Sequence, residues 1–265
     1  MLGVHKSTYY YHQQEKKTKN RAKKSDTELV KKIKQIKLDH PFWGYRRVWA
    51  WLVYQEKIVI NHKKVYRLMK ENNLLVEQKR YKAKRKSTHP KPSPTRPNQW
   101  WGTDMTKFFV NQVGWVYVIF VLDWFTRKIV GYKLSLRCRS QEWIEALEMA
   151  VQTQCPQGAR EYYLNLMSDN GSQPTSQAYM NVCNTLEINH ITTSYSNPKG
   201  NAETERLIRT FKEEVVWPNE FDQYSETIDA VENFIEFYNH QYPHSSLGYL
   251  SPVEFEKNYV EKLAA

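Results

Sequence analysis

A basic, proline-rich stretch over residues 79–98 constrains the architecture of this chain more than any other feature. It contains four prolines and no apolar face, so it excludes a continuous helix and predicts an extended linker. Net charge changes sign along the chain: residues 1–98 hold 26 Lys and Arg against 7 Asp and Glu, and residues 99–265 hold 13 against 21. We therefore expect a basic region over 1–78, a linker over 79–98 and an acidic body over 99–265.

Composition limits the class of protein. A chain of 265 residues with 40% hydrophobic and 14% aromatic residues can bury a sizeable core. Its most apolar stretch, Val116 to Trp124, has the length of a strand, and no apolar run reaches the roughly 18 residues of a membrane span. The three cysteines are scattered and odd in number, so they fit a reducing cytoplasm better than a disulfide framework. The basic arm predicts a phosphate-rich partner such as DNA.

The basic region has the pattern of three short helices. Asp26 can begin a helix that runs to Leu38, Tyr45 to Tyr54 forms a second, and His62 to Asn72 forms a third behind the N-cap residue Asn61. Two short helices with a short connection, the second strongly basic, predict a helix-turn-helix. An ordinary three-helix bundle with solvated lysines is the alternative. The candidate DNA contacts are basic side chains of the third helix and the linker: Lys63, Lys64, Arg67, Lys79, Arg80, Lys84 and Arg85.

The acidic body begins with strands. Alternating patterns predict strands over 103–111, 114–122 and 127–135, joined by tight turns as an antiparallel meander. Helices and short strands alternate after them, so we expect a mixed α/β sheet flanked by helices. The later predicted elements are helices over 141–154, 176–186 and 228–238, a helix from about 202 to 216, a strand that ends at 167 and a strand over 188–192.

Three acidic residues carry the predicted chemistry: Asp104 in the first strand, Asp169 just after the fourth, and Glu205 in the helix that follows. They converge only if the first and fourth strands are neighbours and the helix crosses the sheet. Such a group of carboxylates suits two divalent cations, which activate an attacking oxygen and stabilise a leaving oxygen in phosphoryl transfer. Taken singly, each Asp can be a turn residue, and Glu205 can pair with Arg209.

The helix with Glu205 also carries cations. Lys212 lies two helical turns after Glu205 on the same face, and Arg209 shares that face. Together with Arg206 these are further candidate DNA contacts. Glu203 is a rival to Glu205, but it points away from this face.

Several motifs together resemble bacterial insertion-sequence transposases of the second-reading-frame (OrfB) type, which carry a retroviral-integrase-like (DDE) core. The resemblance covers nearly the whole chain. It rests on the helical block around residues 40–47 and on these later motifs: Trp101-Gly102-Thr103-Asp104, Asp123 to Gly131, Ser168-Asp169-Asn170-Gly171-Ser172, Asn201-Ala202-Glu203-Thr204-Glu205, Lys212, and Tyr238 to Tyr249 with Ser251-Pro252.

The resemblance implies an RNase H-like fold in which Asp104, Asp169 and Glu205 bind two Mg²⁺ or Mn²⁺ ions and catalyse the reaction. Water first cuts the strand at the element's end, and the freed 3′-hydroxyl then attacks another phosphodiester. The implied partners are double-stranded DNA (terminal inverted repeats and target), at least a second copy of the chain, and an upstream-frame protein or frameshift fusion. Lys212 is implied to lie near the element end.

Two positions depart from the family pattern. Tyr242 stands where Arg is usual, and Gly200 stands where many relatives have an acidic residue. Neither change touches the three acidic residues.

Other functions remain open at this point. A nuclease of the same fold would cut without joining, and a DNA-binding regulator would have an inactive core. No Cys precedes Cys138, so the zinc module of retroviral integrases is not expected. His240 and His244 have the spacing of metal ligands on a helix but lack partner cysteines, so a structural or DNA-contacting role is favoured.

Overall fold

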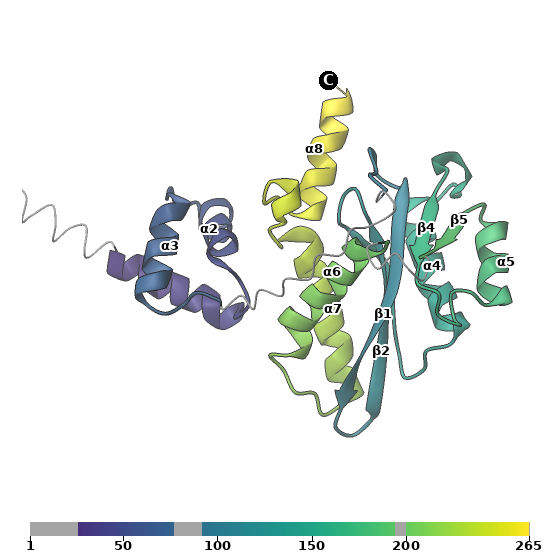
Figure 1. Cartoon of the computed structure of the whole chain (residues 1–265), viewed down its shortest axis with the longest axis horizontal. Helices are drawn as coiled ribbons and strands as arrows, with labels where there is room; N and C mark the ends of the chain where they lie inside the picture. Colours follow the sequence, from purple (N-terminus) through teal and green to yellow (C-terminus); the bar gives the residue numbers. More distant parts are fainter. Residues whose placement is uncertain (1–25, 77–91, 194–199, 265) are drawn as a thin grey trace, which may run out of the picture. The chain divides into compact units, whose positions relative to one another are not determined.

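The computed structural model describes residues 26–76, 92–193 and 200–264. The chain divides into two compact units, Met1–Tyr81 and Lys82–Ala265 (Figure 1). The division falls inside the predicted linker, most of which lies outside the described residues. The end of that stretch already belongs to the second unit, since Asn98 is buried there and its amide donates to Asp123 at 2.6 Å.

The first unit consists of a helix over residues 26–39, α2 (Tyr45–Tyr54) and α3 (His62–Glu71). The side chain of Asn61 caps α3 by accepting from the amide of Lys63 at 2.8 Å. Apolar residues at helical spacing are buried: Leu29, Ile33, Ile36, Val48, Leu52, Val65, Leu68 and Met69. The three predicted helices are therefore confirmed to within a residue or two.

The second unit is built on a five-stranded mixed sheet in the order β3-β2-β1-β4-β5. The first three strands form the predicted antiparallel meander, whereas β4 and β5 run parallel to β1. This confirms the expected fold class. The strands are β1 (Trp100–Val110), β2 (Gly114–Asp123), β3 (Ile129–Ser135), β4 (Asn165–Ser168) and β5 (Asn189–Thr192).

Helices cover both faces of this sheet (Figure 1). On one face, Trp101 and Ile119 of the sheet pack with Trp143 and Leu147 of α4 in a core that α5 completes. On the other face, Phe120 contacts Phe211 of α6, with ring centroids 5.3 Å apart. The helical elements are α4 (Ser140–Gln154), η1 (Arg160–Tyr162), α5 (Gln177–Thr185), α6 (Ala202–Phe211), η2 (Lys212–Val216), α7 (Tyr224–His240), η3 (Ser245–Leu247) and α8 (Pro252–Ala264).

Two helices differ from the prediction. The helix with Glu205 was expected to continue regularly to about residue 216, but its α-helical part ends at Phe211 and a π-helical turn, η2, follows. The helix expected over 228–238 begins four residues earlier, because Gln223 and Glu226 form a capping box that periodicity alone does not reveal.

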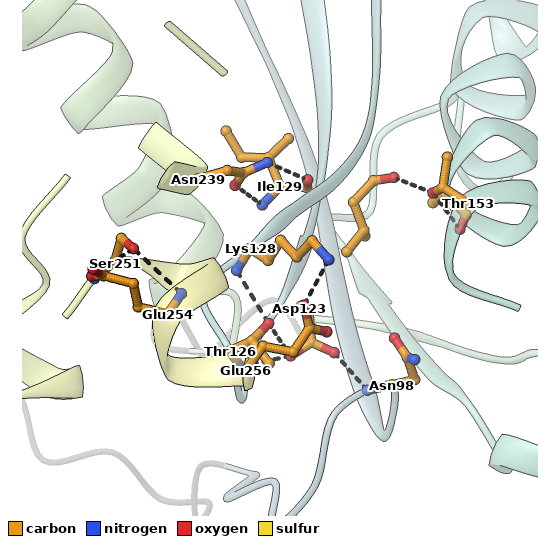
Figure 2. A network of polar contacts seen from close by, with 12 residues as sticks. Asn98, Asp123, Thr126, Lys128, Ile129, Thr153, Asn239, Ser251, Glu254 and Glu256 are labelled. Carbon is orange, nitrogen blue, oxygen red and sulfur yellow. Dashed lines mark hydrogen bonds and ion pairs between the residues drawn. The ribbon is translucent and has the colours of Figure 1, made fainter. Parts of the chain in front are cut away.

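A polar network fixes the turn between β2 and β3 (Figure 2). Oδ1 of the buried Asp123 accepts from the amides of Phe125 and Thr126, both at 2.8 Å. Asn239, in the last turn of α7, exchanges two hydrogen bonds with the backbone of Ile129, at 2.9 and 3.0 Å. These contacts hold α7 against β3. The motif from Asp123 to Gly131 and the block from Tyr238 to Tyr249 therefore both stabilise the fold.

Among the residues that the structure describes, none of the helices combines the length and apolar character needed to cross a membrane.

Candidate active site

Asp104 and Asp169 approach each other because β1 and β4 are neighbouring parallel strands. The pairing ends with Gly102 opposite Met167, and Asp104 and Asp169 each lie two residues further on. Asp104 is half-buried within β1, whereas Asp169 is exposed just after β4. The two carboxylates could converge only if the first and fourth strands were adjacent, and the structure has them adjacent.

Helix α6 brings Glu205 to the same place. Asn201, just before α6, donates from Nδ2 to the carbonyl of Thr103 at 3.0 Å, and Trp124 Nε1 donates to Oγ1 of Thr204 at 3.1 Å. A Cβ on Gly102 would lie 2.1 Å from Thr204 Oγ1, so glycine permits this close approach of helix and strand. Side chains alternate along a strand, so Asp104 faces the same side as Gly102, toward α6.

The charges of these residues are coupled. Burial raises the pKa of Asp104 from 3.8 to about 6, and the negative charges of Asp169 and Glu205 add to the rise. The amide of Met105, which donates to Asp104 at 2.8 Å, and the charge of Lys212 oppose it. Partial burial of the Glu205 carboxyl also raises its pKa. The structure thus brings Asp104, Asp169, Glu205 and Lys212 into one electrostatic site.

Glu203 has a different environment. Its carboxylate forms an ion pair with Arg127 in the turn between β2 and β3. Arg127 has a positive φ of 63°, a backbone conformation that non-glycine residues seldom adopt. The rival carboxylate is therefore paired with a local cation.

The arginines of α6 are paired with Glu213. This glutamate has only 7% of its side chain exposed, and it lies 2.8 Å from Arg209 and 3.8 Å from Arg206. The alternative pairing of Glu205 with Arg209 is thus not the one that the structure shows. Arg206 and Arg209 keep 47% and 65% of their side chains exposed and remain accessible.

The predicted DNA contacts of the first unit fall into two groups. Lys63 is exposed on α3, but Lys64 and Arg67 form ion pairs with Asp26 at 2.6 and 3.0 Å. These pairs lower the pKa of Asp26. Sequence spacing did not reveal the pairing, because 41 residues separate Asp26 from Arg67. The predicted linker contacts Lys79, Arg80, Lys84 and Arg85 lie outside the described residues.

The two histidines and the unusual tyrosine lie at the end of α7. His240 is the last residue of that helix and His244 lies beyond it, so they do not form a metal pair along one helix. Tyr242 is 1% exposed and stacks on Tyr238, with centroids 5.4 Å apart. The departure from the family pattern is accommodated as a buried aromatic contact.

Sequence reasoning missed the residues that hold α6 on the sheet: Gly102, Trp124, Asn201 and Thr204. One signal was available, since a glycine within a strand often marks close approach of another backbone. The hydrogen bond between Trp124 and Thr204 could not be inferred from the sequence, because 80 residues separate them.

The donor set suits a hard cation, because carboxylate oxygens are the ligands that Mg²⁺ and Mn²⁺ prefer. Within the described ranges, no three His, Cys, Asp or Glu side chains are drawn together into a closed metal-binding group. The three carboxylates interact through their charges while remaining apart. The fit to Mg²⁺ or Mn²⁺ rests on the hard carboxylate oxygens of Asp104, Asp169 and Glu205, which would hold such an ion.

Family models match most of the chain. An HTH-like domain matches residues 24–82, and two Integrase core domain models match residues 94–198 and 186–252. The chain is similar to the "Putative transposase InsK for insertion sequence element IS150" of Escherichia coli, with 33% identity over 95% of this chain and 89% of that protein. It is also 29% identical to the "Insertion element IS600 uncharacterized 31 kDa protein" of Shigella sonnei, over 100% of this chain and 99% of the relative.

A solved structure supports the fold. A chain in the structure of the simian T-cell lymphotropic virus intasome in complex with PP2A regulatory subunit B56 gamma superposes with a TM-score of 0.50 at 18% sequence identity. The match covers 78% of this chain and 73% of that chain.

The mixed sheet, its helical layers and the matched core models define an RNase H-like polynucleotidyl transferase of the DDE class. Within that class, the chain belongs to the family of insertion-sequence transposases, in their second-reading-frame (OrfB) type. The enzyme cleaves DNA at the ends of an element and transfers the strands to new positions.

Proposed function

We propose that Asp104, Asp169 and Glu205 form the catalytic centre of this transposase. The observation that carries the proposal is geometric: Asp104 and Asp169 each lie two residues beyond the last pair of the neighbouring strands β1 and β4, and α6 brings Glu205 to the same side of β1. The negative charges of Asp169 and Glu205 also add to the rise that burial causes in the pKa of Asp104. Clustered carboxylates are costly in a folded protein unless a cation compensates them. Two Mg²⁺ or Mn²⁺ ions held there would supply an activated attacking oxygen and stabilise the leaving oxygen.

The two steps then share one site. In the first, water attacks the phosphorus at the element's end, the P–O3′ bond breaks, and a 3′-hydroxyl is released. In the second, that hydroxyl attacks another phosphodiester, so one bond forms while one breaks and no external energy source is needed. Asp104 is fixed by β1, whereas Asp169 and Glu205 are more exposed, so DNA approaches from their side.

Cations next to the centre bind the DNA in this proposal. Lys212 is close enough to lower the pKa of Asp104, so it can contact a phosphate beside the reacting one. Arg206 and Arg209 contact phosphates further along, where the buried Glu213 fixes their guanidinium groups. In the first unit, Lys63 contacts the element end directly, and Asp26 orients Lys64 and Arg67.

The active species is a complex of at least two copies, since both element ends must be held during strand transfer. The expected partners are the terminal inverted repeats and the target duplex. An upstream-frame protein or frameshift fusion remains a prediction from the resemblance.

Labelled element ends test the proposal when cutting and joining are measured separately. Asp104→Asn, Asp169→Asn and Glu205→Gln should each abolish both steps. Glu203→Gln is the matched control, because it removes a neighbouring carboxylate that pairs with Arg127. It should retain activity. Loss of activity in Glu203→Gln with retention in Glu205→Gln would contradict the assignment.

A further inference from the structure

Asp169 depends on its neighbours for its position, because it lies outside the strand that precedes it. Ser168, the last residue of β4, is completely buried, whereas Asp169 is exposed. The amide of Thr193 donates to the carbonyl of Ser168 at 2.9 Å, and the side-chain amide of Asn170 donates to the carbonyl of Thr193. The loop that carries Asp169 is thus attached to the ends of β4 and β5.

A buried hydroxyl adds a second attachment. Oγ of Ser168 lies 2.9 Å from the carbonyl oxygen of Asp169 and 2.9 Å from Nε2 of His190 on β5. A carbonyl only accepts, so the single hydroxyl proton of Ser168 is donated to Asp169. Oγ then has only lone pairs to offer His190, and Nε2 of His190 must carry a proton and donate it to Ser168.

His190 is held in place for this role. It lies opposite Leu166 in the parallel pairing of β4 and β5, and the ring of Tyr179 meets its imidazole edge-on at 5.4 Å. Burial lowers the pKa of His190, which favours the neutral ring. A neutral imidazole that donates from Nε2 has its proton on that nitrogen alone.

We propose that His190 is a positioning residue for Asp169, acting through a chain of hydrogen bonds from His190 Nε2–H to Ser168 Oγ–H and on to the Asp169 carbonyl. The chain fixes the peptide that follows Asp169 and thereby the direction of its carboxylate. This inference rests on the proposed role of Asp169 as a metal ligand. Partners behind a ligand commonly change metal affinity about 10- to 100-fold when they are removed.

The first test is direct observation of the imidazole in the full-length wild-type chain. Nitrogen-15 chemical shifts of His190 at neutral pH should report a neutral ring protonated at Nε2. A neutral ring protonated at Nδ1 alone would leave Nε2 without a proton to donate to Ser168 and would overturn the proposal. This measurement needs neither metal nor activity.

The second test uses paired variants. His190→Leu and Ser168→Ala should each raise the Mn²⁺ concentration for half-maximal cutting, and the dissociation constant for Mn²⁺ by titration calorimetry, by about 10-fold. The double variant should be no worse than either single one, because both break the same chain. His190→Gln places an amide donor near Nε2 and should restore most of the affinity. Cys183→Ala, a cavity variant in the core that includes Tyr179, should lower stability without changing Mn²⁺ affinity.

The outcomes separate the two proposals. If Asp169→Asn abolishes cutting while His190→Leu keeps wild-type Mn²⁺ affinity, the positioning role fails and the catalytic role stands. If Asp169→Asn stays active, the catalytic assignment itself fails. Additive losses in the double variant, or no rescue by His190→Gln, would also overturn the hydrogen-bonded chain.

Discussion

Gly102→Ala is the substitution that most directly connects the fold to the site. The added methyl group would lie 2.1 Å from Thr204 Oγ1, 2.3 Å from Trp124 Nε1 and 2.8 Å from Asn201 Oδ1. All three atoms belong to the side chains that seat α6 on the sheet. Since non-bonded carbon atoms settle near 3.5–4.0 Å, relief of the shortest contact requires a movement of about 1 Å or more.

Two magnitudes follow from that displacement. Overpacking of this kind typically costs about 1–3 kcal/mol of folding free energy. Glu205 moves with α6, and a misplacement of about 1 Å at a reacting centre can lower the rate about 100-fold. We therefore expect Gly102→Ala to lose far more activity than its loss of stability explains.

The assay is cutting of a labelled element end, normalised to folded protein from thermal unfolding. Gly131→Ala is the matched control, because its methyl group would meet the Ala146 carbonyl of α4 at 2.4 Å, on the other side of the sheet. It should be destabilised to a similar extent while activity per folded molecule stays near wild type. Equal activities per folded molecule in the two variants would refute the argument.

Three further perturbations have expected outcomes. Asp104→Asn should stabilise the metal-free protein at pH 7 by up to about 3 kcal/mol and have little effect at pH 4. The pKa of Asp104 is raised from 3.8 to about 6 in the folded protein, so ionisation of this carboxyl lowers the stability of the wild type as pH rises through that range. Urea unfolding at both pH values measures the difference. Asn239→Ala should cost about 1–3 kcal/mol by leaving the Ile129 backbone groups unsatisfied, with activity per folded molecule retained. Lys63→Glu should weaken binding to the element end and reduce the slope of the binding constant against salt concentration by the equivalent of about one phosphate contact. Lys34→Glu makes the same charge change on the first helix and should have a smaller effect on both quantities.

The sequence predicted the fold well where periodicity is strong. The three strands of the meander and the helices of the first unit follow from alternating and helical patterns over eight or more residues. The π-helical turn at Lys212–Val216 could not be predicted, because its sequence has no signal that separates it from an ordinary helix. The sequence also did not show that the end of the predicted linker belongs to the folded second unit, because the burial of Asn98 depends on its hydrogen bond with the distant Asp123.

Part of the site's geometry could be predicted from the sequence. Asp104 was expected in the first strand, Asp169 just after the fourth and Glu205 in a following helix, and their convergence was predicted on the condition that these two strands are neighbours, as they are in the sheet. Long-range partners could not be predicted from the sequence. The ion pair of Arg127 with Glu203 distinguishes the environment of Glu203 from that of Glu205, but no local sequence pattern connects its two residues.

The central claim is that Asp104, Asp169 and Glu205 together bind the metal ions that serve DNA cleavage and strand transfer. Anomalous diffraction from crystals of the enzyme with Mn²⁺ and an element-end duplex tests it most directly. We predict two Mn²⁺ peaks bridged by these three carboxylates. Peaks on other residues, or Mn²⁺ bound at Glu203 with Glu205 turned away, would contradict the account.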